Sequence, residues 1–108
     1  APDWKPVVIR EKANGIFAGA AVDMDGDGDL DYVGARYSPG LLYWLEQPSW
    51  KYHLVDDRID GIHGLTTGDV NRDGEPDIVG NSAQPKGPFA NSIAVFLSPK
   101  WDRHIFAD

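Results

Sequence analysis

Apolar residues along the chain occur in short runs, each bounded by Gly, Pro, Asp, Asn or Ser. No segment repeats apolar positions at the i, i+3, i+4, i+7 spacing of an amphipathic helix over three turns. Short runs rich in β-forming residues and separated by turn residues predict strands instead. The runs are 19–22 (GAAV), 30–37 (LDYVGARY), 41–46 (LLYWLE), 50–55 (WKYHLV), 65–68 (LTTG), 76–82 (PDIVGNS), 92–97 (SIAVFL) and 101–106 (WDRHIF).

The order of these runs repeats along the chain. With an offset of 46 residues, Trp4 aligns with Trp50, and the segment 23–34 (DMDGDGDLDYVG) aligns with 69–80 (DVNRDGEPDIVG). A third copy begins at 101–106 after a spacing of 51, because the second copy is lengthened by five residues around SAQPKGPFA. Each repeat predicts four short antiparallel strands joined up and down, which is the size of one β-propeller blade.

We therefore predict an all-β protein with two full propeller blades, at 16–55 and 62–106, and an extra outer strand at 4–9. The small residues of the first strand in each repeat suit the crowded strands around a propeller axis. A two-sheet sandwich is the alternative fold. It would not require a long repeat with the same loop chemistry in both copies, so the propeller is favoured.

Composition narrows the class of protein. A chain of 108 residues is one small domain at most, and its 42% hydrophobic content is sufficient for a folded core. It has no Cys, so a disulfide framework is excluded and the compartment is left open. No apolar run is long enough to cross a membrane. The chain begins with Ala-Pro, and we expect it to derive from a longer precursor by loss of a signal peptide or tag, or by proteolysis.

The charge is concentrated in two loops. The net charge of −7 disfavours nucleic acid and anionic membranes as partners. Seven acidic residues account for the whole excess: Asp23, Asp25, Asp27, Asp31, Asp69, Asp73 and Asp77. A block of like charge is often only a solvated segment, and an Asp-rich turn is the simplest alternative here.

The spacing of these acids indicates metal binding. In DMDGDGDLD the carboxylates stand at positions 1, 3, 5 and 9 with Gly at 6, and DVNRDGEPD repeats the pattern with Asn at position 3. EF-hand loops use oxygen ligands at positions 1, 3 and 5 and a Gly at 6. Both loops offer hard oxygen ligands without His or Cys, which favours calcium over zinc or copper. A true EF-hand would have flanking helices and a Glu at position 12, where this chain has Gly34 and Gly80.

The segments 22–34 and 68–80 resemble the calcium loops of FG-GAP repeats, also called VCBS repeats. Repeats of this family build the propellers of integrin α-subunits, fungal lectins and many secreted bacterial proteins. The resemblance implies two calcium sites and a secreted, extracellular or periplasmic location. The implied side-chain ligands are Asp23, Asp25, Asp27 and Asp31 in the first loop, with the Asp29 carbonyl, and Asp69, Asn71, Asp73 and Asp77 in the second, with the Glu75 carbonyl.

A candidate ligand face lies at the opposite ends of the strands. His53 and His104 occupy equivalent places in the two repeats, which indicates a structural role for both. His63 has Phe17 as its counterpart, so it departs from the repeat. The residues of this candidate face are Arg36, Tyr37, His63, Lys86 and Phe89. A solvated loop is the alternative for each of them.

Two classes of function follow. The first is a calcium-stabilised module that binds a glycan or a protein, and the second is a propeller segment of a larger secreted carbohydrate-active enzyme of the lyase or dehydratase type. The Trp-led outer strand resembles propellers of sugar-processing enzymes such as aldos-2-ulose dehydratase. No nucleophile–base pair or phosphate loop can be identified, so we do not expect catalysis by this chain alone. Further blades are the expected partners, supplied by a longer chain or by other copies.

Overall fold

The structure is a computed structural model that describes residues 6, 8–9, 16–82 and 91–107. The described residues contain no helix, and strands account for all their regular secondary structure, as predicted. The strands are β1 (Ile16–Val22), β2 (Asp31–Arg36), β3 (Leu41–Glu46), β4 (Lys51–Asp56), β5 (Ile62–Gly68), β6 (Asp77–Ser82), β7 (Ser92–Leu97) and β8 (Asp102–Ala107).

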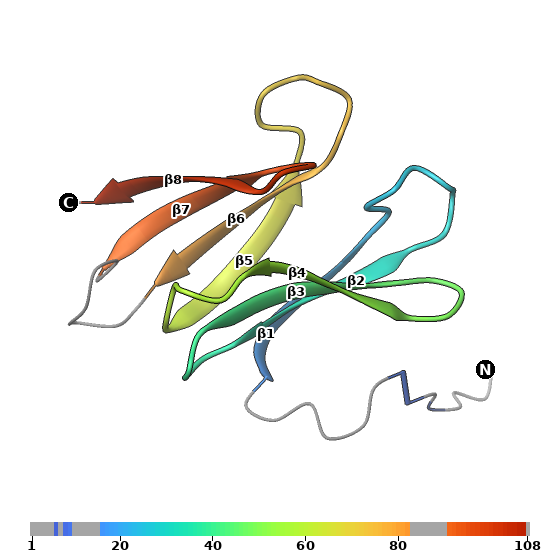
Figure 1. Cartoon of the computed structure of the whole chain (residues 1–108), viewed down its shortest axis with the longest axis horizontal. Coiled ribbons are helices and arrows are strands. Elements are labelled where there is room, and N and C mark those ends of the chain that lie inside the picture. The colour runs from blue at the N-terminus through green and yellow to red at the C-terminus, as the bar shows by residue number, and fades with distance from the viewer. Residues whose placement is uncertain (1–5, 7, 10–15, 83–90, 108) are drawn as a thin grey trace, which may run out of the picture.

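The strands form two four-stranded antiparallel sheets, ordered β1-β2-β3-β4 and β5-β6-β7-β8 (Figure 1). Each sheet is one predicted blade, with its strands joined up and down. β4 and β8 begin one residue later than predicted. The reason is that Trp50 and Trp101, which precede them, have left-handed backbones with φ of 58° and 61°. That conformation belongs to a turn and cannot continue a strand.

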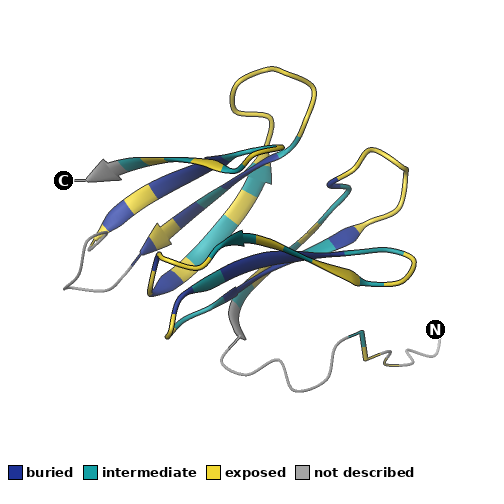
Figure 2. Cartoon of the chain, in the orientation of Figure 1, coloured by how far each residue is buried: buried dark blue, intermediate teal, exposed yellow. Residues whose placement is uncertain are grey.

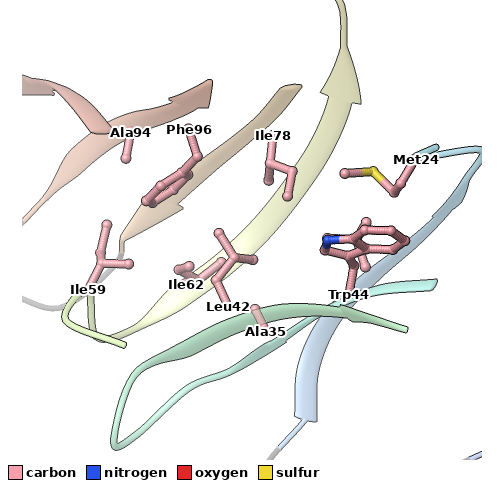
Figure 3. Packing of buried hydrophobic residues seen from close by; sticks show 10 residues of the cluster. Met24, Ala35, Leu42, Trp44, Ile59, Ile62, Ile78, Ala94 and Phe96 are labelled. Atoms are coloured by element: carbon pink, nitrogen blue, oxygen red, sulfur yellow. The ribbon is translucent and has the colours of Figure 1, made fainter. Parts of the chain in front are cut away.

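One hydrophobic core lies between the two blades (Figure 2). Alternate residues of each strand face it, as the period of two requires. Blade one contributes Val33, Ala35, Leu42 and Trp44, and blade two contributes Ile62, Ile78, Ala94 and Phe96. Figure 3 shows Met24, from the first acidic loop, beside the ring of Trp44 in the same core.

The two sheets come closest along β1 and β5, the first strand of each. β2 also approaches β5, whereas the outer strands of the two sheets have fewer contacts with each other. Blades of a propeller meet in this way around an axis, while the sheets of a sandwich pack along their whole faces. The arrangement therefore supports the predicted blades over a sandwich.

The linker at 57–61 fixes the second blade to the first. Ile59 is fully buried, and the Asp60 carboxylate accepts a hydrogen bond from the backbone N–H of Gly40. A Cβ on Gly40 would collide with the carbonyl oxygen of Ile59, so only Gly allows this close approach. The Ser82 hydroxyl of blade two donates to the Asp60 carbonyl at 2.7 Å. The linker is thus bonded to both blades.

The extra outer strand predicted at 4–9 lies mostly outside the described residues, so it stays a prediction. Within the part of the chain that the structure describes, no helix is long and apolar enough to cross a membrane.

Candidate metal centres

The two acidic loops connect the first and second strands of each blade. Loop one (23–30) joins β1 to β2, loop two (69–76) joins β5 to β6, and both project from the same end of the molecule (Figure 1). Each loop carries a group of three carboxylates that could hold a metal ion, with one oxygen from each within 4.8 Å of the others. The groups are Asp23, Asp25 and Asp27 in loop one and Asp69, Asp73 and Asp77 in loop two.

The carboxylate at position 1 organises loop one. Asp23 Oδ1 accepts the backbone N–H of Gly26 at 2.9 Å and of Asp27 at 3.2 Å, and Oδ2 accepts that of Gly28 at 2.9 Å. The Gly28 amide, with those of Gly26 and Asp27, holds the pKa of Asp23 below its usual range. Asp23 is therefore anionic at neutral pH, as a metal ligand must be.

Loop two repeats this arrangement. Asp69 accepts the N–H of Asp73 at 3.0 Å and of Gly74 at 2.8 Å. Position 6 has a left-handed backbone in both loops, with φ of 90° at Gly28 and 89° at Gly74. Because a Cβ disfavours this conformation, Gly at position 6 is a requirement of the backbone.

Position 9 also has a structural role in both loops. Asp31 is 1% exposed, and its two oxygens accept the backbone N–H groups of Met24 and Gln47, each at 2.9 Å. Asp77 is fully buried and accepts the N–H of Val70 at 2.9 Å. The sequence predicted these two residues as metal ligands only. The structure adds that each fastens its loop to the blade beneath it.

At position 7 the predicted ligands are backbone carbonyls. The same two residues donate their N–H groups to the carboxylate at position 5: Asp29 to Asp27 Oδ1 and Glu75 to Asp73 Oδ1, both at 2.9 Å. These bonds orient the position-5 carboxylates within the loops. The carbonyl ligands themselves stay a prediction.

The side chain of Asn71, at position 3 of loop two, lies near the carboxylates of Asp69 and Asp73. Its side-chain oxygen faces only acceptors, 3.2 Å from Asp69 Oδ1 and 3.1 Å from Asp73 Oδ1. The oxygen and the NH₂ group of an amide have nearly the same shape, so this side chain can present either of them to the two carboxylates. With the amide turned over, the NH₂ group would instead donate to both carboxylates. The donor set, all oxygen, fits a hard divalent cation.

Loop one contains a contact that the sequence analysis missed. Reduced hydration, with hydrogen bonds to Glu46 and Asp27, raises the pKa of Asp25 to about 7. Glu46 ends β3, and its Oε1 lies 2.7 Å from His53 Nε2. The His53 contact, followed by Asp25, lowers the pKa of Glu46. No motif could reveal Glu46, because the second repeat has Leu97 in its place.

The candidate ligand face lies at the far ends of the strands from the acidic loops. There Tyr37 and His63 meet edge to face, with ring centroids 6.3 Å apart. Arg36 is turned toward its own loop, since its Nε donates to the Pro39 carbonyl at 2.8 Å. The structure thus brings two of the predicted residues together. The other two, Lys86 and Phe89, lie outside the described residues.

A family model described as an FG-GAP-like repeat matches residues 23–80, which include both acidic loops. No curated protein matches the chain significantly, and no solved structure does. The family match agrees with the two four-stranded blades and with the paired loops at equivalent positions. On these grounds, the chain belongs to the FG-GAP-like repeat family.

Proposed function

We propose that each acidic loop binds one calcium ion and that the chain is a calcium-stabilised propeller module. The observation that carries this proposal is the convergence of three carboxylates at equivalent places in two blades. In loop one the ion is held by the carboxylates of Asp23, Asp25 and Asp27. In loop two it is held by Asp69, Asp73 and the Asn71 amide oxygen. Asp31 and Asp77 close the two sites.

Calcium has a direct effect on stability in this scheme. Crowded carboxylates repel one another, and the repulsion is greatest in the folded chain because folding fixes their separation. An ion that binds only the folded state adds stability by mass action, of about 2.7 kcal/mol when its concentration is a hundred times the dissociation constant. Calcium therefore raises the melting temperature of the chain.

Thermal melts test the proposal. The 108-residue chain should melt at a higher temperature in millimolar calcium than in excess chelator. Asp27→Ala and Asp73→Ala, which each remove a position-5 carboxylate, should lower the calcium-loaded midpoint. Asp57→Ala is the control, because Asp57 is an exposed carboxylate outside both loops. Coincident midpoints for the wild-type chain in calcium and chelator would refute calcium binding.

We further propose that the module acts outside the cytoplasm and binds a glycan or a protein at the face opposite the loops. The location rests on the family and the calcium sites, since extracellular and periplasmic fluids supply the free calcium that modest sites require. The face is supported by the contact between the rings of Tyr37 and His63, at the ends of the strands far from the acidic loops. Aromatic rings at a surface suit polar ligands with apolar faces.

A glycan array probed with the calcium-loaded chain tests the ligand class. Binding to a defined set of glycans that is lost on His63→Ala would support a glycan ligand at this face. Retained binding in that variant would place the ligand elsewhere. An array without any bound glycan would favour a protein ligand.

A further inference from the structure

Glu46 lies outside the acidic loops but touches loop one. It is the last residue of β3, and antiparallel pairing of β1, β2 and β3 brings that end of β3 beside the loop. The next residue, Gln47, donates its backbone N–H to Asp31 at 2.9 Å and its side-chain amide to the Leu30 carbonyl, so this end of β3 lies against loop one. There the carboxyl groups of Glu46 and Asp25, at position 3 of the loop, interact and shift each other's pKa. Glu46 therefore extends the cluster of carboxylates from a second part of the chain.

The position of Glu46 is fixed by a chain of contacts from the core. Glu46 Oε1 lies 2.7 Å from His53 Nε2, and the two side chains are 31% and 30% exposed. The His53 ring stacks on Trp44, with centroids 4.1 Å apart and an interplanar angle of 12°. Trp44 is buried between the blades beside Met24. The carboxylate is thus held in one place rather than free to move with the solvent.

Two carboxylate oxygens in contact repel each other, so the pair holds either a shared proton or a cation. The Nε2 atom of His53 lies 2.7 Å from Glu46, Lys51 is the partner of Glu46 in the β3–β4 register, and Asp25 is its neighbour in loop one. A cation in loop one would sit beside Asp25. Glu46 can then coordinate it directly or accept a hydrogen bond from a water bound to it.

We infer that Glu46 is a further residue of the loop-one calcium site, positioned by His53, and that it makes this site tighter than the site in loop two. The inference rests on the proposed calcium binding. Calcium affinity rises with the charge and rigidity of the ligand set. Loop one has the additional carboxylate of Glu46, whereas loop two has Leu97 at the equivalent place and the neutral Asn71 at position 3.

Blade two also lacks the other contacts that hold Glu46 in place in blade one. His104 is the counterpart of His53, but it is exposed and has Val95 where blade one has Trp44. The histidine therefore repeats along the chain without its carboxylate or its stacking partner. Because only the His is repeated, the sequence indicates a structural role for His53 and does not reveal its contacts with Glu46 and Trp44.

A calcium titration followed by NMR tests the inference on the whole 108-residue chain. The Gly28 amide reports on loop one and the Gly74 amide on loop two, because each is bonded to the position-1 carboxylate of its own loop. Glu46→Gln keeps the shape of the side chain and its capacity to accept from His53, but removes the charge. We expect loop-one affinity to fall about tenfold, as for other residues that support a metal ligand, with loop two unchanged.

Two further variants separate this role from general effects. Asp57→Asn removes one negative charge outside the loops and should leave both affinities unchanged. Leu97→Glu places a carboxylate beside loop two and should tighten that loop alone. A Glu46→Gln chain that binds calcium at loop one as tightly as the wild type would overturn the inference while leaving the proposed function intact. A wild-type chain in which neither glycine amide responds to calcium would overturn both.

Discussion

Asp56 on β4 and Arg103 on β8 form an ion pair that joins the two blades. Their side chains are 10% and 17% exposed. The other oxygen of Asp56 accepts the backbone N–H groups of Arg58 and Ile59, both at 3.0 Å. A single carboxylate thus connects the outer strand of blade two to the start of the linker, and the relative position of the blades depends on it.

Removing the arginine should weaken the packing of the blades. Arg103→Ala leaves the Asp56 carboxylate largely buried without its cation, and we expect the free energy of unfolding to fall by about 2 kcal/mol. Chemical denaturation in calcium is the measurement. Lys100→Ala is the matched control, since Lys100 is an exposed cation in the turn before β8 and should change stability by less than about 0.5 kcal/mol. If both variants lose the same free energy of unfolding, the ion pair does not stabilise the contact between the blades.

Position 9 and position 5 of the loops should respond differently to loss of charge. Both oxygens of Asp31 accept backbone N–H groups, so Asp31→Asn turns an NH₂ group toward a donor. We expect it to lower stability by about 2 kcal/mol with calcium or with chelator. Asp27→Asn keeps an oxygen to accept the N–H of Asp29 and should lower only the calcium-loaded stability.

Paired melts of these two variants, with and without calcium, make the comparison. If Asp31→Asn is harmless in chelator, the hydrogen bonds of its carboxylate do not fasten the loop, and position 9 serves the metal alone.

Much of this architecture could be predicted because it depends on local patterns. Short β-rich runs between turn residues identified the eight strands, although β1 and β5 begin three residues before the predicted runs at 19–22 and 65–68. The repeat identified the two blades. The backbone at Trp50 and Trp101 shifted only the strand starts, since a left-handed residue in a turn looks like any other Trp in sequence.

The contacts that could not be predicted depend on register. Glu46 reaches Asp25 because three strands pair side by side, and no spacing in the sequence expresses that. The buried bonds of Asp31 were missed for the same reason. Its partner Gln47 follows β3, whereas the loop itself precedes β2. Glu46 also lies outside the nine-residue loop motif that marked the candidate metal ligands, and its counterpart in the second repeat is Leu97.

The raised pKa of Asp25 predicts a pH dependence in the calcium-free chain. Reduced hydration, with Glu46 and Asp27, raises this pKa from 3.8 to about 7. The folded chain then binds more protons than the unfolded chain between these values, so its stability falls as pH rises. The contribution of Asp25 is complete below the unfolded pKa and is lost as pH rises through about 7.

Melts in chelator from about pH 5 to about pH 8 measure this effect. The midpoint of the wild-type chain should decrease over that range, and Asp25→Asn should decrease less because its amide does not titrate. If the melting midpoints of the wild-type and Asp25→Asn chains fall by the same amount over this pH range, the titration of Asp25 is not the cause of the pH dependence.

The last prediction concerns the outer faces of the two blades. Met24 of loop one is 6% exposed because blade two covers it, whereas its counterpart Val70 in loop two is 52% exposed. Ile93 is also 52% exposed, and it alternates with the β7 residues that face the core. Leu54 is 47% exposed on β4 of blade one. Each blade thus leaves apolar side chains without a neighbouring blade.

Within the chain, the Val33–Trp44 face of blade one packs on the Ile78–Phe96 face of blade two. The same head-to-tail rule would place the free face of blade two, with Val70 and Ile93, on the free face of blade one of another copy. Such contacts use two different surfaces and join copies into a ring or an open chain. We therefore expect the purified, calcium-loaded chain to associate.

Light scattering measures this association. Ile93→Lys should shift the chain toward its monomer mass of 11.9 kDa, because it places a charge in the middle of the contact. Leu30→Lys is the control: Leu30 is 58% exposed in loop one and should leave association unchanged. A wild-type chain that is a compact, cooperatively melting monomer would contradict the prediction. In that case the two blades alone bury enough apolar surface to fold, and the exposed side chains of the outer faces would need no covering blade.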